Sequence, residues 1–218
     1  MLSKIKKYKI EKWDLVWFIL IPLLNINYII TDRMEVTGMN IDIILDGMIP
    51  FIPMFVLPYV YWYLYMGFGL IFLLLKDRKI YIKTFLTLII GMCICYVIYF
   101  IFPTEITRPE IVKDGIFNNI VKIVYENDRP FNCFPSLHVL GTYIIMRYIK
   151  SDYSRVWFEY TQIVGVMIIL STLFIKQHFV LDVLASIILG EILILLVQAV
   201  DDKCVEFIIN IPRWLKSK

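Results

Sequence analysis

The sequence predicts an all-α, polytopic membrane protein with six transmembrane helices and an interfacial amphipathic helix between the third and fourth of them. The 218 residues are 60% hydrophobic and 16% aromatic, which exceeds the apolar share of soluble domains. Several apolar runs reach the length of about 20 residues that a helix needs to cross a bilayer. Little length remains for a soluble domain, so we expect residues 1–218 to form a single membrane domain.

The first three spans are joined by short polar segments. A basic N-terminus precedes the first apolar run, and no small-x-small cleavage site follows it, so we interpret Trp13 to Ile30 as a retained helix. Residues 39–48 suit a short helix along the interface. The second span is placed at about Pro53 to Leu75 and the third at about Ile80 to Phe102, with a polar turn, Lys76 to Lys79, between them.

The longest segment between spans, Thr104 to Pro135, is expected to be an extracytoplasmic loop that carries part of the functional site. Apolar residues recur at helical spacing over Ile111 to Tyr125, as in an amphipathic helix lying on the bilayer. The fourth span, Ser136 to Ile149, is short, so its first residues should lie near the membrane surface. The fifth and sixth spans follow at Val156 to Ile175 and Phe179 to Val200.

Aromatic residues and cysteines are assigned packing roles. Trp62, Tyr63 and Tyr65 in the second span are interpreted as packing or interface aromatics. Cys133 lies in the candidate site but is interpreted as a small space-filling residue. No Cys-x-x-Cys pair occurs, so the sequence predicts neither a zinc site nor a disulfide framework.

Lysine and arginine residues are distributed unevenly between the two sides of this arrangement. They concentrate at the N-terminus, in the second-to-third and fourth-to-fifth turns and in the C-terminal tail. The positive-inside rule therefore predicts a multi-pass cell-membrane protein with both termini in the cytoplasm. The only two histidines, His138 and His178, open the fourth and sixth spans, which puts both at the extracytoplasmic side.

His178 and Asp182 are four residues apart and therefore share one face of a helix. A carboxylate in that place accepts the proton of one ring nitrogen, which fixes the tautomer and leaves the other nitrogen with a free lone pair. Such a histidine can act as a nucleophile or a base. The pair alone is equally compatible with a buried His–Asp contact that joins two helices.

The segment Pro135-Ser-Leu-His138 begins the fourth span. Proline suits the first turn of a helix, and the free N–H groups there, with the helix dipole, form an anion site. Ser136 adds a hydroxyl donor. Guanidinium and ammonium groups would complete a phosphate site, although a lone interfacial cation more often extends to the lipid headgroups. The candidate cations near the two histidines are Arg108, Arg129 and Lys176.

Two histidines beside an anion site predict a two-step phosphoryl transfer. His178 attacks phosphorus in line, and His138 protonates the leaving alcohol as a general acid. Water or a second alcohol then takes the phosphoryl group from the phosphohistidine, with His138 as the base. This chemistry needs no metal and no cofactor. The expected partners are the membrane and a lipid phosphate, with no nucleic acid.

These segments resemble three motifs of the type 2 phosphatidic acid phosphatase superfamily. Pro135-Ser-Leu-His138 is similar to its Pro-Ser-Gly-His motif, and Arg108-Pro109 resembles the Arg-Pro that ends its first motif. Ser171 together with His178-x-x-x-Asp182 resembles the third motif, Ser-Arg-x5-His-x3-Asp. The resemblance implies a nucleophile, His178, an acid and base, His138, an orienting carboxylate, Asp182, and phosphate ligands, Arg108, Ser136 and, from the third motif, Ser171.

Three positions depart from the family pattern. The lysine of the first motif is replaced by Ile101, the arginine of the third motif by Thr172, and the glycine of the second motif by Leu137. Lys176 and Arg129 could supply the missing charge from other backbone positions. This variant is similar to the branch that includes inositol phosphorylceramide synthases, which transfer a phospho-headgroup between lipids.

The sequence therefore predicts a metal-independent, membrane-embedded phosphatase that hydrolyses a lipid phosphate or diphosphate. One alternative is a lipid phosphotransferase that moves a phospho-headgroup to an alcohol or a second lipid, since a diester has one fewer anionic oxygen to bind. Another is a non-catalytic membrane carrier or assembly protein. The presence of His138, His178 and Asp182 argues against this last alternative.

Overall fold

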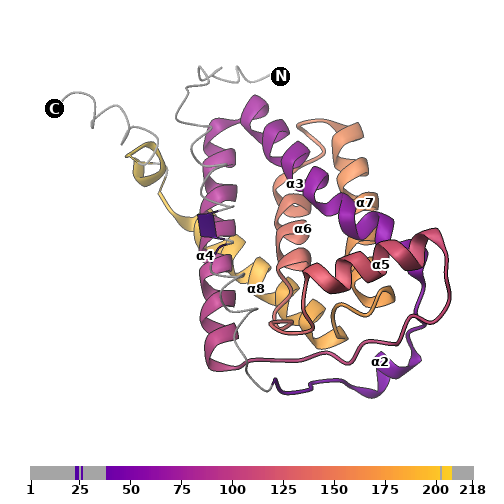
Figure 1. Cartoon of the computed structure of the whole chain (residues 1–218). Helices are drawn as coiled ribbons and strands as arrows, with labels where there is room; N and C mark the ends of the chain where they lie inside the picture. Colours follow the sequence, from indigo (N-terminus) through magenta and orange to yellow (C-terminus); the bar gives the residue numbers. More distant parts are fainter. Residues whose placement is uncertain (1–22, 25, 27–37, 202, 208–218) are drawn as a thin grey trace.

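The computed structural model describes residues 23, 24, 26, 38–201 and 203–207, and Figure 1 shows their arrangement. The described residues form helices and loops, with no β-strand among them. Four helical stretches are long and apolar enough to cross a membrane: Pro53–Lys76, Arg78–Ile101, Arg155–Phe174 and Val180–Ala199. The predicted all-helical membrane protein is thus confirmed. The predicted first span falls almost entirely outside the described residues.

Helices α3 (Val56–Lys76) and α4 (Arg78–Ile101) correspond to the predicted second and third spans. A 3-10 turn, η2 (Pro53–Phe55), leads into α3. The two long helices are separated by Asp77 alone, whose side chain accepts hydrogen bonds from the backbone N–H groups of Lys79 and Ile80 at 2.9 and 3.2 Å. This N-cap explains how two long apolar helices can reverse direction within so short a connection.

Helix α6 (Leu137–Tyr148) lies at the centre of the bundle and contacts α3, α4, α7 (Arg155–Phe174) and α8 (Val180–Ala199). It has 12 residues, about 18 Å at 1.5 Å per residue, and so is as short as predicted. At Gly69 of α3, a Cβ atom would lie 2.7 Å from the Ile145 side chain, so glycine permits the close approach of α3 to α6. The long helices thus surround α6 and bury most of its surface.

Helix α5 (Ile116–Asn127) is amphipathic, as predicted, but begins five residues later than the predicted start at Ile111. Residues 104–106 pair their backbone groups with Met39, Pro130 and Asn132. The helix begins only after Gly115, whose φ of 155° lies outside the helical range. One face of α5 packs Val121 and Val124 against Val56 and Tyr59. The predicted interfacial helix over residues 39–48 is confined to α2 (Ile44–Met48).

Candidate active site

The segments that contain the two histidines meet at one end of the bundle. His138 is the second residue of α6, and His178 lies two residues before α8 begins. Their ring centroids are 6.4 Å apart. The sequence predicted this meeting, because two spans between the histidines return the chain to the side from which it left.

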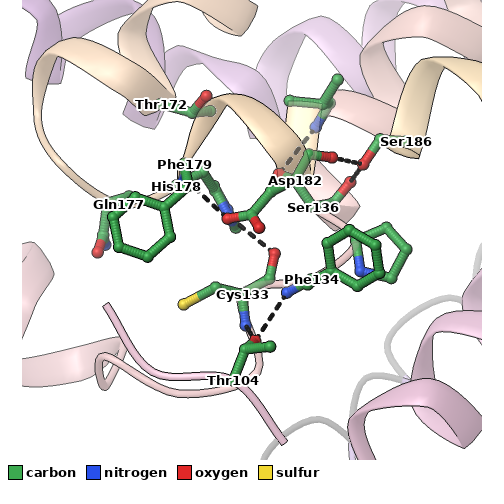
Figure 2. Close-up of polar contacts among 12 residues, drawn as sticks. Thr104, Cys133, Phe134, Ser136, Thr172, Gln177, His178, Phe179, Asp182 and Ser186 are labelled. Carbon is green, nitrogen blue, oxygen red and sulfur yellow. Dashed lines mark hydrogen bonds and ion pairs between the residues drawn. The ribbon is translucent and has the colours of Figure 1, made fainter. Parts of the chain in front are cut away.

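The His178 ring is fixed by two acceptors on the same nitrogen (Figure 2). Its Nδ1 lies 3.2 Å from Asp182 Oδ2 and 3.0 Å from the carbonyl oxygen of Cys133. Asp182 is fully buried, and its Oδ2 also accepts the backbone N–H of Phe179 at 2.9 Å. Because both partners of Nδ1 are acceptors, the neutral ring carries its proton there, and Nε2 keeps the lone pair. His178 is therefore prepared as a nucleophile or base.

The loop before α6 is tied to α8 through Ser186. Its hydroxyl lies 2.9 Å from the carbonyl oxygen of Ser136 and 2.7 Å from that of Asp182. Thr104 holds the same loop from the other side, because its hydroxyl accepts the backbone N–H groups of Cys133 and Phe134 at 3.0 and 3.1 Å. The Cys133 carbonyl that binds His178 is thus held in place at both flanks.

The turn before His178 is a helix C-terminal motif with lysine at its left-handed position. Lys176 has a φ of 54°, a conformation that favours glycine. The backbone N–H of Gln177 reaches the carbonyl of Thr172, and that of Lys176 reaches Leu173, the two bonds of a Schellman motif. The Lys176 ammonium donates to the carbonyls of Asp46 and Ile49 at 2.8 and 2.6 Å. These bonds fasten the turn that aims His178.

His138 is held mainly by aromatic rings. The Tyr59 ring stacks on it at a centroid distance of 4.3 Å and an angle of 20°, and the Trp62 ring lies 4.4 Å away, tilted by 41°. Its Nε2 is buried and has no hydrogen-bond partner among the described residues. The sequence assigned Trp62 only a packing or interface role, because nothing in a helical repeat distinguishes an aromatic residue that faces a catalytic histidine from one that faces lipid.

Arg108 is brought to the site by backbone pairing between the two ends of the loop that contains it. Ile106 N–H donates to the Pro130 carbonyl at 2.9 Å. The Arg108 guanidinium donates to the carbonyls of Tyr125 and Arg129 at 3.2 and 3.0 Å and to the side-chain oxygen of Gln177. It also lies over the Tyr125 ring, 4.4 Å from the centroid.

Tyr125 supports this arrangement from α5. Its hydroxyl donates to the carbonyl of Ile175 at 2.5 Å. Burial raises the pKa of Tyr125 to about 12, and the nearby Arg108 charge only partly opposes that rise. The phenol therefore stays protonated at neutral pH and remains a donor beneath the guanidinium.

A cavity of about 720 Å³ opens onto both histidines. Four of its lining residues carry buried side-chain nitrogens that have no hydrogen-bond partner in the part of the chain that the structure describes: Trp62 Nε1, Arg108 Nε, Asn132 Nδ2 and His138 Nε2. Buried polar groups are normally paired, and each of these four can donate. Several unpaired donors on residues that line one cavity suit an anion with several oxygens, such as a phosphate group.

The predicted phosphate ligands divide into two sets. Arg108 and Arg129 line the cavity, with Arg129 exposed at its edge. Ser136, Ser171 and Lys176 do not line it. Ser136 caps α6 by accepting the Val139 N–H, the Ser171 hydroxyl donates to the carbonyl of Ile168 in its own helix, and Lys176 is committed to the turn described above. Their predicted role as phosphate ligands is not supported by these contacts.

Asn132, Gln177 and Asp128 line the cavity and were not predicted. Their only sequence signal is position, since Asn132 and Asp128 flank Arg129 in the loop and Gln177 precedes His178. Asn132 has a φ of 56°, a conformation that asparagine tolerates well. Among the described residues, no group of three or more histidine, cysteine or acidic side chains is arranged to hold a metal ion.

A family model described as the PAP2 superfamily matches residues 50–196, well over half of the chain. The matched range contains every residue that lines the cavity. Neither the curated proteins nor the solved structures that were compared with the chain give a match.

Proposed function

This chain belongs to the PAP2 superfamily, and from that premise we propose that it is a membrane-embedded phosphatase acting on a lipid phosphate or diphosphate. Members of the family are typically phosphatases. One observation carries the proposal for this chain. His178 is held so that Nε2 keeps its lone pair, and four residues with an unpaired donor, His138 among them, line the same cavity.

In the first step, Nε2 of His178 attacks phosphorus in line with the leaving oxygen. The new P–N bond forms as the P–O bond breaks, and His138 gives its proton to the departing alcohol. Asp182, 3.2 Å from Nδ1, stabilises the positive charge that the His178 ring gains. The product of this step is a phosphohistidine.

In the second step, His138 removes a proton from water, whose oxygen attacks phosphorus while the P–N bond breaks. His178 returns to its neutral tautomer, and inorganic phosphate leaves. Throughout both steps, Arg108 Nε, Asn132 Nδ2 and Trp62 Nε1 donate to the phosphoryl oxygens on which charge develops. The Arg108 guanidinium is anchored before substrate binds by its bonds to Tyr125, Arg129 and Gln177, which is the condition for this kind of stabilisation.

The apolar part of the cavity supports a lipid substrate. Met66 and Leu70 of α3, Leu88 and Met92 of α4 and Leu140 of α6 line it. From Tyr59 to Leu70, the lining follows α3 for 12 residues, about 16 Å at a rise of 1.5 Å per residue. We assign this part to one hydrocarbon chain of the substrate, with the phosphate at the histidines.

The proposed topology has six spans, with α5 at the interface and the site on the extracytoplasmic side. It is supported by the exposure of Ile116 and Ile123 on α5 and by the excess of basic residues at the opposite end of the spans. A membrane-impermeant thiol reagent provides a test with single cysteines introduced at Lys113 and Lys150. Labelling of intact cells at Lys113 alone supports this orientation, and labelling at Lys150 alone reverses it.

A second function, transfer of a phospho-headgroup to an alcohol or second lipid, is favoured by the charge of the cavity. Thr172, at the position of the family arginine, is buried and bonds its own helix, and Ile101 replaces the family lysine. The Asp128 carboxylate also lines the cavity. A site with fewer cations and a nearby carboxylate suits a phosphodiester, as in the inositol phosphorylceramide synthase-like branch.

The deciding experiment measures phosphate release by purified protein from a panel of lipid monophosphates and diphosphates, with EDTA present throughout. We expect release that vanadate blocks and that His178→Ala abolishes. Release that requires added metal contradicts the proposed mechanism. If release is absent and headgroup exchange occurs only when an alcohol or a second lipid is added, the transferase is the correct function. If neither occurs, the chain is not an enzyme of either kind.

The same panel tests the place of the lipid chain. A Cβ atom on Gly67, which lines the cavity, would meet no atom within 4 Å, so Gly67→Leu fills space without a clash. We expect it to reduce activity on long chains and to spare short ones. Gly47 in α2 is equally open but lies outside the cavity, so Gly47→Leu is the matched control. Equal activity of Gly67→Leu on all chain lengths would contradict this assignment.

A further inference from the structure

Asp128 is the C-cap residue of α5, and its side chain contacts both Tyr59 and Gln177. We propose that Asp128 is a positioning residue, which orients His138 through Tyr59 and the Arg108 guanidinium through Gln177. The proposal rests on the proposed function and assigns Asp128 no contact with substrate. Its Oδ2 accepts the Tyr59 hydroxyl at 2.9 Å and the Gln177 side-chain amide at 3.2 Å.

The first connection runs from Asp128 to the acid and base of the reaction. Tyr59 is 3% exposed, and its ring stacks on His138. Val56, Val121 and Ile175 surround Tyr59 with apolar contacts, which confine the ring but do not select its depth or rotation. The hydrogen bond from the Tyr59 hydroxyl to Asp128 sets the depth and rotation of the ring, because the bond is directional and fixes the position of the hydroxyl. The plane against which His138 lies is thereby fixed.

The second connection runs from Asp128 to the phosphate-binding guanidinium. An amide side chain has a donor end and an acceptor end of nearly the same shape. Beside the Asp128 carboxylate, the NH₂ group of Gln177 must face the acid, so its oxygen must face Arg108. That oxygen accepts from Arg108 Nη2, while Nη1 and Nη2 also reach the carbonyls of Tyr125 and Arg129. With these bonds made, Nε is the guanidinium nitrogen left unpaired in the cavity.

The backbone of Asp128 is fixed independently of these side-chain bonds. Its N–H donates to the carbonyl of Val124 at 2.9 Å and so continues the hydrogen-bonding pattern of α5. Val121 and Val124 pack α5 against α3, the helix that carries Tyr59. A carboxylate in a phosphate-binding cavity repels the substrate, which is a cost unless the acid has another use. Holding two neutral donors in defined orientations is such a use.

The test compares two substrates that differ only in their need for an acid. An alkyl phosphate has a poor leaving group and needs His138 to protonate it, whereas p-nitrophenyl phosphate leaves without help. Release of the leaving group in the first turnover is measured for both. The variants are Asp128→Ala, Asp128→Asn, Tyr59→Phe and Gln177→Met. Tyr65→Phe is the matched control, since Tyr65 on the same helix donates to the Thr161 carbonyl and does not line the cavity.

Each connection predicts a different pattern of loss. Tyr59→Phe should slow the alkyl substrate about 10-fold and leave the aryl substrate nearly unchanged. Gln177→Met should weaken binding of both substrates about 10-fold, because Arg108 loses its fixed orientation. Asp128→Ala should combine both effects, to about 100-fold on the alkyl substrate. Asp128→Asn keeps an oxygen that can accept both bonds and should restore most of the activity.

Several results would overturn the proposal. Equal losses on both substrates in Tyr59→Phe, or an Asp128→Asn variant as impaired as Asp128→Ala, would mean that orientation is not what Asp128 supplies. If the Asp128 variants keep wild-type kinetics and their melting temperature falls as much as that of Tyr65→Phe, the role of Asp128 is purely structural. If Asp128→Ala does not fold, Tyr59→Phe and Gln177→Met carry the test alone. Wild-type protein inactive on both substrates refutes the proposed function itself, and with it the role assigned to Asp128.

Discussion

The two histidines of the candidate site are held by different kinds of contact. His178 is fixed through hydrogen bonds, with Nδ1 3.2 Å from Asp182 and 3.0 Å from the Cys133 carbonyl. His138 is fixed through the faces of Tyr59 and Trp62, and its Nε2 has no partner in the described part of the chain. Both rings lie at the same cavity, so the difference is not one of burial or location.

The difference fits the two roles proposed for them. A nucleophile must present one lone pair, so its tautomer has to be fixed before substrate arrives, and two acceptors on one nitrogen accomplish this. A general acid and base must gain and lose a proton in each cycle. Aromatic faces hold a neutral imidazole by stacking and attract an imidazolium. The aromatic slot formed by Tyr59 and Trp62 therefore tolerates both states of His138. Hydrogen bonds as directional as those of His178 would favour one state.

The largest effect is expected from deleting each histidine and looking for the covalent intermediate. His178→Ala removes the attacking atom and should give no acid-labile phosphoenzyme, with turnover lowered at least about 1,000-fold. His138→Ala should still form the phosphoenzyme from p-nitrophenyl phosphate, because that leaving group needs no acid. The phosphoenzyme should accumulate in this variant, because no base remains to activate the attacking water. Rapid quench with labelled substrate measures both.

Trapped phosphoenzyme in His178→Ala would reverse the assigned roles of the two histidines. Absence of phosphoenzyme in both variants, with turnover retained in one of them, would mean that water attacks the substrate directly and that no phosphohistidine forms.

The next largest effect is expected from Asp182→Asn, which alters one of the two acceptors that hold His178 Nδ1. An asparagine cannot stabilise the positive His178 ring as a carboxylate does, and its amide nitrogen is a wrong partner for Nδ1–H. We expect kcat to fall between about 100- and 10,000-fold, as for the corresponding change in serine proteases. Steady-state kinetics with the best lipid phosphate provide the measurement.

Asp46→Asn is the control for that loss. Asp46 is also buried and also caps the start of α8, since its Oδ1 accepts the Val180 N–H at 2.8 Å, but it is not one of the two partners of His178 Nδ1. The Asp46→Asn variant should lower stability and leave kcat nearly unchanged. An equal fall of kcat in both variants would mean that Asp182 acts by supporting the helix start and not by orienting His178.

The same contrast explains how much of the site was readable from the sequence. The His178–Asp182 pair was predicted because a helix imposes a spacing of four residues on two side chains that must meet. The Cys133 carbonyl, the second acceptor, could not be predicted, because every residue has a carbonyl and only the folded loop selects this one. The aromatic slot around His138 was missed for the related reason that Trp62 and Tyr63 also suit a membrane interface.

The fold was predicted in type and order, and its errors lie where local and tertiary signals compete. Long apolar runs predicted α3, α4, α7 and α8, because burial in a membrane depends mainly on composition. The start of α5 was predicted too early, because Gly115 has a φ of 155°, outside the helical range, and the helix begins only after it. The phosphate-binding role of Lys176, expected because it is two residues from His178, stays a prediction. The left-handed turn directs its ammonium to α2 and the residue that follows it.

A smaller effect is expected at the aromatic slot from Trp62→Phe. Phenylalanine keeps an aromatic face near His138 but lacks the indole N–H that is unpaired in the cavity. Loss of one hydrogen bond to the phosphoryl group corresponds to about 1 kcal/mol, or roughly a 5-fold fall in kcat/KM. Trp157→Phe is the control, because Trp157 stacks on Phe72 away from the cavity. A loss above 100-fold would mean that the indole ring itself positions His138.

The smallest effect on activity is expected from Lys176→Met, which tests whether the turn before His178 supplies a phosphate ligand or only support. Methionine keeps much of the side-chain length and loses the charged donor to the carbonyls of Asp46 and Ile49. We expect the free energy of unfolding to fall by about 1 to 3 kcal/mol, seen as a lower melting temperature in detergent, with KM changed less than about 2-fold.

Lys150→Met provides the matched control for Lys176→Met, because Lys150 is exposed in the turn between α6 and α7. It should change neither melting temperature nor KM. The contrary result for Lys176→Met is a 10-fold rise in KM with unchanged stability. The ammonium would then have to leave both carbonyls when substrate binds, and His178 would be aimed by a turn that rearranges during the reaction. His178 would no longer be the rigidly held member of the pair, and the contrast between the two histidines would hold only before substrate binds.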